Sequence, residues 1–162
     1  MATPTTLPAA FTSGQVLTAA QLNDLRGAFR VLQVVQATNA STTTISTNAY
    51  ASINLSASIT PSSTTSKILV FATVGAVIKN GDTRAAMQLF RGATGVFIGG
   101  NFINYTATGL EVGSSASLMY LDSPATVSAT TYEIKIASGS NVAYVQVNSG
   151  ATNSIILMEI SA

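Results

Sequence analysis

The chain of 162 residues contains no cysteine and no histidine, and only 8% of its residues are charged. Without cysteine, disulfides and thiolate metal sites are excluded, whatever the redox compartment. Without histidine, the side chain that most often acts as a general base near neutral pH is missing. Ordinary globular domains carry about a quarter of their residues as Asp, Glu, Lys or Arg, so solubility here must come from Ser, Thr and Asn.

The scarcity of charge also argues against partners that are bound through charge. The net charge is +1, and the seven cations stand singly along the chain rather than in clusters. Nucleic acids and anionic membrane surfaces both require a basic patch, so neither is an expected partner. The longest apolar run, Ile68 to Ile78, is too short to cross a bilayer and is better explained as buried β-structure.

The six carboxylates lie far apart in the sequence and give no indication of an active site. General acid–base and glycosidase chemistry need facing carboxyl groups with shifted pKa values. We therefore expect a solvated or loop position for each acid, with no catalytic residue, no metal site and no cofactor. A hydrolase acting on surface polysaccharide is the enzymatic alternative. Glu133 and Lys135, two residues apart on one predicted strand, are expected to form a weak surface pair.

From Val31 onward the sequence has the period of two that is typical of β-strands. In the run YASINLSASITP, every second residue from Ile53 to Ile59 is apolar, and Ser or Asn stands between them. Roughly nine or ten short strands, with turns between them and no helical interludes, predict an antiparallel β-sandwich or jelly roll. The predicted strands cover residues 31–37, 52–59, 67–79, 83–91, 96–107, 115–122, 131–137, 142–148 and 154–160.

Two details of the predicted strands concern glycine. A bend or bulge is expected at Gly75, inside an otherwise apolar strand. Asn80-Gly81 is the strongest short hairpin signal in the sequence, because both central positions of a type I′ turn need positive φ. We therefore predict a β-hairpin at Asn80-Gly81.

The residues that precede the first strand carry the signature of a short capped helix. Thr18 and Gln21 have the spacing of a capping box, and Leu17 can pack onto Leu22 as a hydrophobic staple. The sequence thus predicts an extended N-terminal arm followed by one short α-helix.

This predicted helix has a single apolar stripe formed by Leu22, Leu25 and Phe29. A helix of about ten residues is marginal alone, so its stability must come from packing that stripe on something else. Either a partner or the chain's own β-domain could provide the contact. We divide the chain into an arm and helix at 1–30, expected to be an anchor, and a β-domain at 31–162.

The leader sequence LPAAFTSGQVLTAAQLNDL resembles the N-termini of tailed-bacteriophage virion proteins, in which an F-x-x-G-x-x-L-T-A stretch precedes a short helix. The remainder, with YASINLSASITPSSTTSKILVFATV, LFRG, SLMYLDSP and SIILMEI, resembles β-sandwich modules of phage fibres and capsid decorations. Those modules are in turn similar to jelly-roll trimers of the tumour necrosis factor class. The resemblance implies a homotrimer and no catalytic residues. The composition, with 47% hydrophobic residues, permits a core-like subunit interface.

The expected function is that of a non-catalytic phage virion structural protein, an externally displayed homotrimer in the virion, assembled in the host cytoplasm. Its expected partners are its own copies and a major capsid or tail protein. Capsid decoration or cement is preferred over a tail fibre, because a fibre needs a shaft and the chain has no heptads or repeats. The expected anchor residues are Phe11, Leu17, Leu22, Leu25 and Phe29.

The alternative is a tail-fibre or receptor-binding module that recognises a host surface glycan or protein. The candidate receptor contacts are Asn101, Asn104 and Tyr105, which stand beside a Gly-rich break in a predicted strand. Three other tyrosines fall inside strands and are expected in the core or at a subunit interface. They are Tyr120, Tyr132 and Tyr144.

Overall fold

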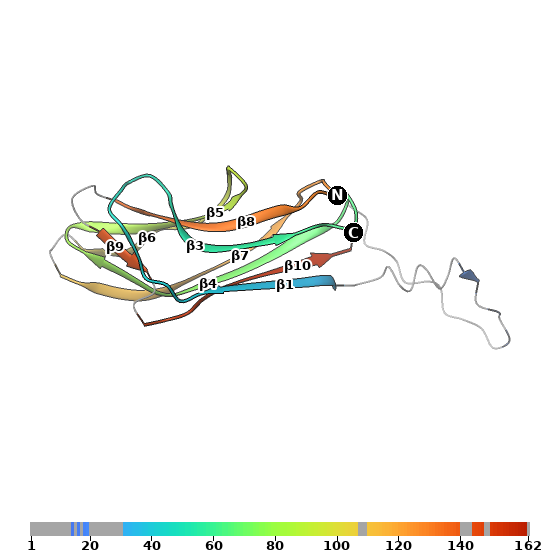
Figure 1. The fold of residues 1–162 in the computed structure, drawn as a ribbon, viewed down its shortest axis with the longest axis horizontal. Helices are drawn as coiled ribbons and strands as arrows, with labels where there is room; N and C mark the ends of the chain where they lie inside the picture. Colours follow the sequence, from blue (N-terminus) through green and yellow to red (C-terminus); the bar gives the residue numbers. More distant parts are fainter. Residues whose placement is uncertain are drawn as a thin grey trace.

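The computed structural model describes residues 31–106, 110–139, 144–147 and 150–161, together with Gly14, Val16, Thr18 and Ala19. Ten antiparallel strands form two layers over these residues (Figure 1). The strands are β1 (Val31–Asn39), β2 (Thr43–Ile45), β3 (Ala51–Ile59), β4 (Lys67–Asn80), β5 (Thr83–Arg91), β6 (Thr94–Thr106), β7 (Val112–Asp122), β8 (Thr130–Ser138), β9 (Tyr144–Val147) and β10 (Asn153–Ile160).

The two layers are called here sheet A and sheet B. Sheet A has the order β1-β10-β4-β9-β2, with β7 paired to β4, and sheet B has the order β3-β8-β5-β6. One edge of β4 pairs with β7, whereas the other edge pairs first with β10 and then with β9. Sheet A is therefore four strands wide at each end, which matches the width of sheet B.

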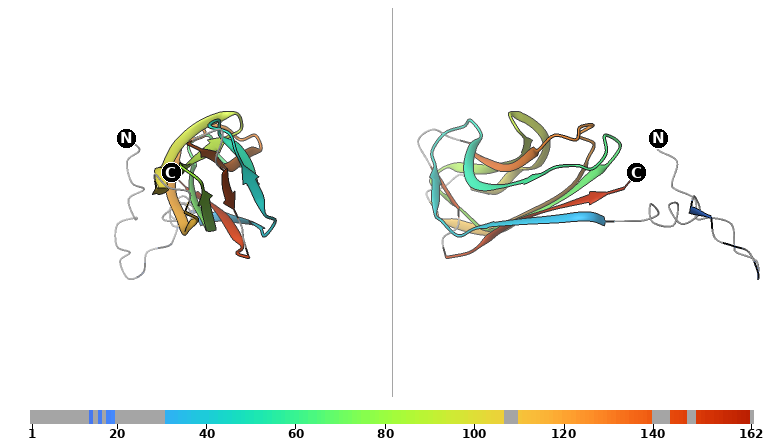
Figure 2. Two further views of the ribbon diagram at one scale, coloured as in Figure 1. Left: turned by 90° about the vertical axis from the view of Figure 1, so that its left-hand side faces the viewer. Right: turned by 45° about the vertical axis from the view of Figure 1, so that its right-hand side comes forward.

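The strand pairs are nested. β5 pairs with β6, β4 with β7, β3 with β8, β2 with β9 and β1 with β10. Such nesting results when one long hairpin is wound over into two facing sheets, which is the jelly-roll arrangement (Figure 2). The predicted all-β sandwich of jelly-roll type is confirmed.

The strand boundaries agree closely with the prediction, with β5 matching at both ends. The exception is β2, which was not predicted. It has only three residues, Thr43–Ile45, and lies in a Ser/Thr-rich stretch where Ile45 alone is buried. A strand of this length carries too little alternation to be recognised, and its position depends on the ladder that it forms with β9.

The prediction of a β-hairpin at Asn80-Gly81 is wrong. Gly81 does have a positive φ of 89°, but β4 belongs to sheet A and β5 to sheet B. The turn therefore carries the chain from one sheet to the other and does not close a ladder between sequential strands. Tertiary packing explains why the two strands do not pair, because β4 and β5 each bury one face in the space between the sheets.

The hydrophobic core fills the space between the sheets. The alternation predicted for β3 is confirmed, because Ile53, Leu55, Ala57 and Ile59 are all buried. Tyr132 is completely buried, as predicted for a core tyrosine. Tyr120 is half-buried and stacks on Phe97 with the ring centroids 5.0 Å apart.

The bend predicted at Gly75 is confirmed. The register between β4 and β7 shifts between Val74 and Val77, close to where the other edge of β4 changes partner from β10 to β9. A Cβ atom on Gly75 would lie 2.9 Å from the Cβ of Ala151. The Gly75 amide donates a hydrogen bond of 2.9 Å to Oδ1 of Asn153. A glycine is thus needed for the close approach of the 150–153 segment.

Glu159 is buried, so the expectation of a solvated or loop position is wrong for this acid. The Ser62 amide and hydroxyl donate to Oε1 at 2.7 and 2.6 Å, and Nε2 of Gln33 donates to Oε2 at 2.7 Å. Burial raises the pKa of Glu159, but hydrogen bonds from Ser62, Gln33 and Ser66 outweigh it and lower the pKa to about 2. The carboxylate therefore ties β1, β10 and the β3–β4 connection together.

Replacing Glu159 by Gln is expected to lower the free energy of unfolding at pH 7 by roughly 2–3 kcal/mol, because charge-assisted hydrogen bonds are lost. The folded pKa of about 2 lies below the ordinary value of 4.5, so this stabilisation is complete above about pH 4.5 and is lost as pH falls toward 2. Urea denaturation of both proteins at pH 7 and pH 3 measures it. The difference between them should shrink at pH 3, and an unchanged difference would contradict this role.

Candidate functional site

The outward surface of sheet A carries two adjacent rows of mainly apolar side chains across four strands, called here the apolar face. Cross-strand pairing defines each row. The first row consists of Val34, Met158, Leu69 and Leu121, and the second of Gln36, Ile156, Phe71 and Met119. Val34, Met119 and Leu121 are 56%, 62% and 54% exposed, and neither row contains a charged residue. Adjoining exposed apolar residues of this kind mark interaction sites more often than isolated ones do.

The apolar face ends sharply at the next row, which is polar. That row consists of Thr38, Ser154, Thr73 and Ser117. The hydroxyls of Thr73 and Ser117 lie 3.3 Å apart and can share a hydrogen bond. Val31 pairs with Ile160 at the opposite edge of the apolar face, so β1 begins and β10 ends at this end of the sandwich (Figure 2). The leader thus joins the β-domain beside the apolar face.

A second cluster is built around Asp122, which is only 5% exposed. Nη1 of Arg91 and the hydroxyl of Tyr132 both donate to Oδ2 of Asp122, at 2.7 and 2.6 Å. Burial and the bond to Asp122 raise the pKa of the Tyr132 hydroxyl. Arg91 and Tyr132 belong to sheet B and Asp122 to sheet A, so the cluster joins the sheets. The expected loop role is wrong for Asp122.

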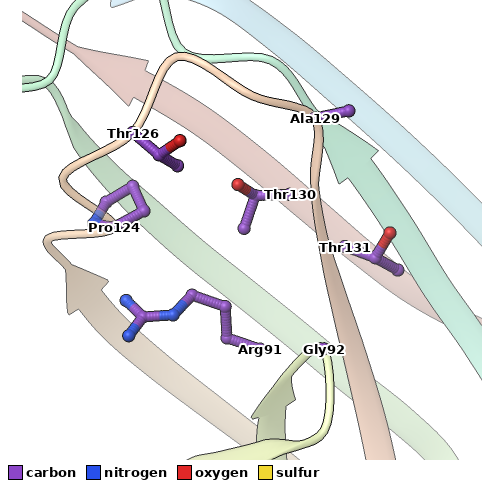
Figure 3. A pocket seen from close by; sticks show the side chains of 7 residues that line it. All are labelled: Arg91, Gly92, Pro124, Thr126, Ala129, Thr130 and Thr131. Atoms are coloured by element: carbon purple, nitrogen blue, oxygen red, sulfur yellow. The ribbon is translucent and has the colours of Figure 1, made fainter.

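The β7–β8 connection leaves a hollow of about 360 Å³ next to Arg91. Figure 3 shows the guanidinium reaching toward Pro124, with Thr126 and Thr130 lining the hollow beyond it. The charge of Arg91 is already balanced by Asp122 at 2.7 Å. An anionic ligand would therefore have to compete with a buried carboxylate, and we assign the cluster a structural role.

A third feature is a groove of about 380 Å³ at the outer surface of sheet B, called here the sheet B groove. Its lining residues are Asn48, Tyr50, Arg84, Ala86, Asn101, Ala137, Ser138 and Gly139. Ala86 and Ala137 are cross-strand neighbours on β5 and β8. Because their side chains are short, the sheet surface is hollow between the longer side chains around them.

An irregularity in the register between β5 and β6 places Asn101 at the groove. Ala85 pairs with Ile103 and Met87 pairs with Gly100, so two residues of β6, Asn101 and Phe102, stand opposite the single residue Ala86 of β5. An extra residue of this kind is a β-bulge, which redirects side chains and is frequent beside binding sites. Asn101 consequently lines the groove, while Phe102 is 66% exposed next to it.

Arg84 is held in place by its neighbours on both sides. Its guanidinium carbon lies 4.1 Å from the ring centroid of Phe102, in cation–π geometry. On the other side, a Cβ atom on Gly139 would lie 2.5 Å from Cγ of Arg84, so a larger residue at position 139 would displace the Arg84 side chain. Among the described residues, the ion pairs are Arg91–Asp122 and Lys135–Glu133, at 2.7 and 3.4 Å, and neither involves Arg84. The second of these is the expected surface pair.

The three candidate receptor contacts lie in different surroundings. Asn101 lines the groove, and Tyr105 is 53% exposed with its ring edge-on to Phe102. Nδ2 of Asn104 instead donates a hydrogen bond of 2.6 Å to the carbonyl oxygen of Val77, and the backbone of Asn104 has a positive φ of 58°. The structure adds residues that the sequence reading did not select, because they come from separate segments. These are Asn48, Tyr50 and Arg84.

The connection that supplies Asn48 and Tyr50 is fixed to the end of β8. The Ser138 amide donates a hydrogen bond of 2.9 Å to the carbonyl oxygen of Thr47. The ring of Tyr50 packs edge-on against Phe90, with the centroids 5.9 Å apart. The groove is therefore formed by parts of the sandwich that are held by backbone hydrogen bonds and by aromatic contacts.

The expected anchor residues lie outside the residues that the structure describes. They are Phe11, Leu17, Leu22, Leu25 and Phe29. Within the described part of the chain, no three His, Cys, Asp or Glu side chains gather where they could hold a metal ion. The same part contains no helix long and apolar enough to cross a membrane. Comparisons with protein-family models and with curated proteins give no significant match.

The structural role of Arg91 and the surface role of Arg84 predict different effects on stability. Arg91→Gln should lower the free energy of unfolding by roughly 1–3 kcal/mol, because it leaves the buried Asp122 carboxylate without its cation. This is less than for a fully buried pair, since the Arg91 side chain is 32% exposed. The matched variant Arg84→Gln should lower the free energy of unfolding by less than about 1 kcal/mol. Urea denaturation measures both, and equal losses would contradict the assignment.

Proposed function

We propose that this protein is a non-catalytic structural protein of a phage virion, displayed on the particle as a homotrimer and held there by its N-terminal segment. Capsid decoration or cement is the role that we favour. The observation that carries the proposal is the apolar face, an exposed surface of sheet A that lies at the end where the leader joins. The virion assignment itself rests on the resemblance of the leader and the strand sequences to phage proteins.

Further copies of the same chain are the occupants that suit the apolar face. The two rows contain no charge, and obligate subunit interfaces resemble a domain core in composition. The polar row that begins at Thr38 and ends at Ser117 limits the contact to one part of the sheet. A closed ring of three subunits would cover this surface on every copy, whereas an open assembly would leave one face uncovered.

The position at which β1 begins is compatible with both contacts. β1 starts beside the apolar face, so the N-terminal segment joins each subunit at a point close to the proposed subunit contact. The proposed partner is a major capsid or tail protein. The buried acids Asp122 and Glu159 are engaged in structural hydrogen bonds, which supports the non-catalytic assignment.

The subunit contact is tested by Met119→Asp combined with Leu121→Asp. Both side chains are exposed on sheet A, so the double variant should stay folded, while charge placed in the contact should convert the oligomer to monomer. Analytical ultracentrifugation gives the mass and circular dichroism the fold. The matched control, Ser117→Asp, lies on the same strand and face but in the polar row, and should remain oligomeric. A wild-type monomer, or a double variant that stays trimeric, would refute this contact.

The anchor is tested by Leu22→Asp combined with Leu25→Asp. This change should leave the β-domain folded and oligomeric but abolish binding to particles, because it places charge on the apolar stripe. Co-sedimentation with particles measures binding. If the double variant fails to fold, the stripe packs on its own domain instead of on a partner.

The sheet B groove favours a second candidate function, that of a tail-fibre or receptor-binding module. Its polar side chains and the nearby rings of Phe102 and Tyr105 suit recognition of a host surface molecule. Electron cryomicroscopy of intact particles separates the two functions. Trimeric knobs spread over the head would support decoration, whereas density at the tail alone would favour receptor binding.

A further inference from the structure

We infer that the sheet B groove binds a saccharide that carries a carboxylate, with Arg84 as the residue that recognises the acid. This inference rests on the receptor-binding alternative and is independent of the subunit contact on sheet A. The groove volume of about 380 Å³ is at the small end of the range of small-molecule sites, which suits one or a few sugar units.

The carboxylate is inferred from the position of Arg84. Arg84 is half-buried, its guanidinium lies over the Phe102 ring, and it belongs to neither ion pair among the described residues. Asp82 precedes Arg84 by two positions, but it is exposed and is not among the residues that line the groove. A planar guanidinium with an open edge suits bidentate binding of a carboxylate.

The remaining lining residues suit sugar hydroxyls. Asn101 presents an amide, which combines donor and acceptor groups, and Tyr50 presents a phenolic hydroxyl. Alternating donors and acceptors are what the hydroxyls of a sugar ring require. Phe102 and Tyr105 are 66% and 53% exposed beside the groove, and their rings can cover the apolar edge of a second sugar unit.

An acidic peptide is the rival ligand, and the groove favours it less. A peptide that binds by strand addition needs a free backbone edge, whereas the groove lies over the paired strands β5 and β8. Its single unpaired cation also offers little to a run of acidic side chains, since Lys135 is 3.4 Å from Glu133. A single cation among amides and aromatic rings suits a saccharide with one carboxylate on a sugar unit better than it suits an acidic peptide.

The test is a binding assay of the full-length protein on an array of uronic-acid and sialic-acid oligosaccharides. Each is paired with its carboxyl-reduced counterpart, which differs only in the acid, and an oligoglutamate peptide represents the rival. We expect binding to at least one acidic oligosaccharide and at least about tenfold weaker binding to the same oligosaccharide after carboxyl reduction. Affinities are then measured by calorimetry.

Variants of the protein complete the design. Arg84→Gln should weaken binding at least about tenfold, and Asn101→Ala should weaken it less. Lys67→Gln is the matched control, because it also removes one half-buried cation but lies on sheet A, where Nζ donates to Ser123. Its affinity should equal that of the wild type. A loss with Lys67→Gln equal to that with Arg84→Gln would show attraction by net charge alone and overturn the inference.

Three further outcomes would also overturn it. They are equal affinity for the carboxyl-reduced ligands, preference for the oligoglutamate peptide, and no binding to any probe by an intact oligomer. The oligomeric state and the retention on particles are measured on the same preparation. A groove that binds nothing, in a protein that still assembles on heads, would therefore refute the saccharide site alone and leave the proposed decoration role standing.

Discussion

The pairing of β4 with three other strands of its sheet is the constraint on which the rest of the structure depends. One edge of β4 is occupied by β7, and the other changes partner from β10 to β9 near Gly75, where the 150–153 segment approaches too closely for a side chain. This change of partner lets ten strands form two sheets of matching width. It also places Leu69 and Phe71 at the centre of the apolar face, and it directs the chain through Gly81 into sheet B.

The two buried carboxylates of the sandwich accept hydrogen bonds from donors on separate strands and connections, and this decides which charges are structural. Glu159 receives hydrogen bonds from Ser62 and Gln33, and Asp122 receives them from Arg91 and Tyr132. Buried carboxylates with such partners hold separate strands together and are poorly suited to exchange ligands. Arg84 differs, because its neighbours fix its position without neutralising its charge.

The two outer surfaces of the sandwich differ in polarity, and this difference supports a division of roles in the proposed function. Sheet A offers an uncharged apolar face beside the start of β1, which suits contact between copies and attachment through the leader. Sheet B offers a polar groove around Arg84, which suits a small polar ligand. In the proposed trimer, the first surface would be covered and the second would stay accessible to the host surface.

The sequence alone determined the all-β class, the strand positions and the bend at Gly75, because alternation and turn residues are local signals. It also selected Asn101, whereas β2 was too short to recognise. Only the tertiary structure decided that Asn80-Gly81 crosses between sheets, that Asp122 and Glu159 are buried, and that Arg84 meets Asn101 in one groove. These features depend on which strands become neighbours, and strand pairing joins residues that no local pattern relates to one another.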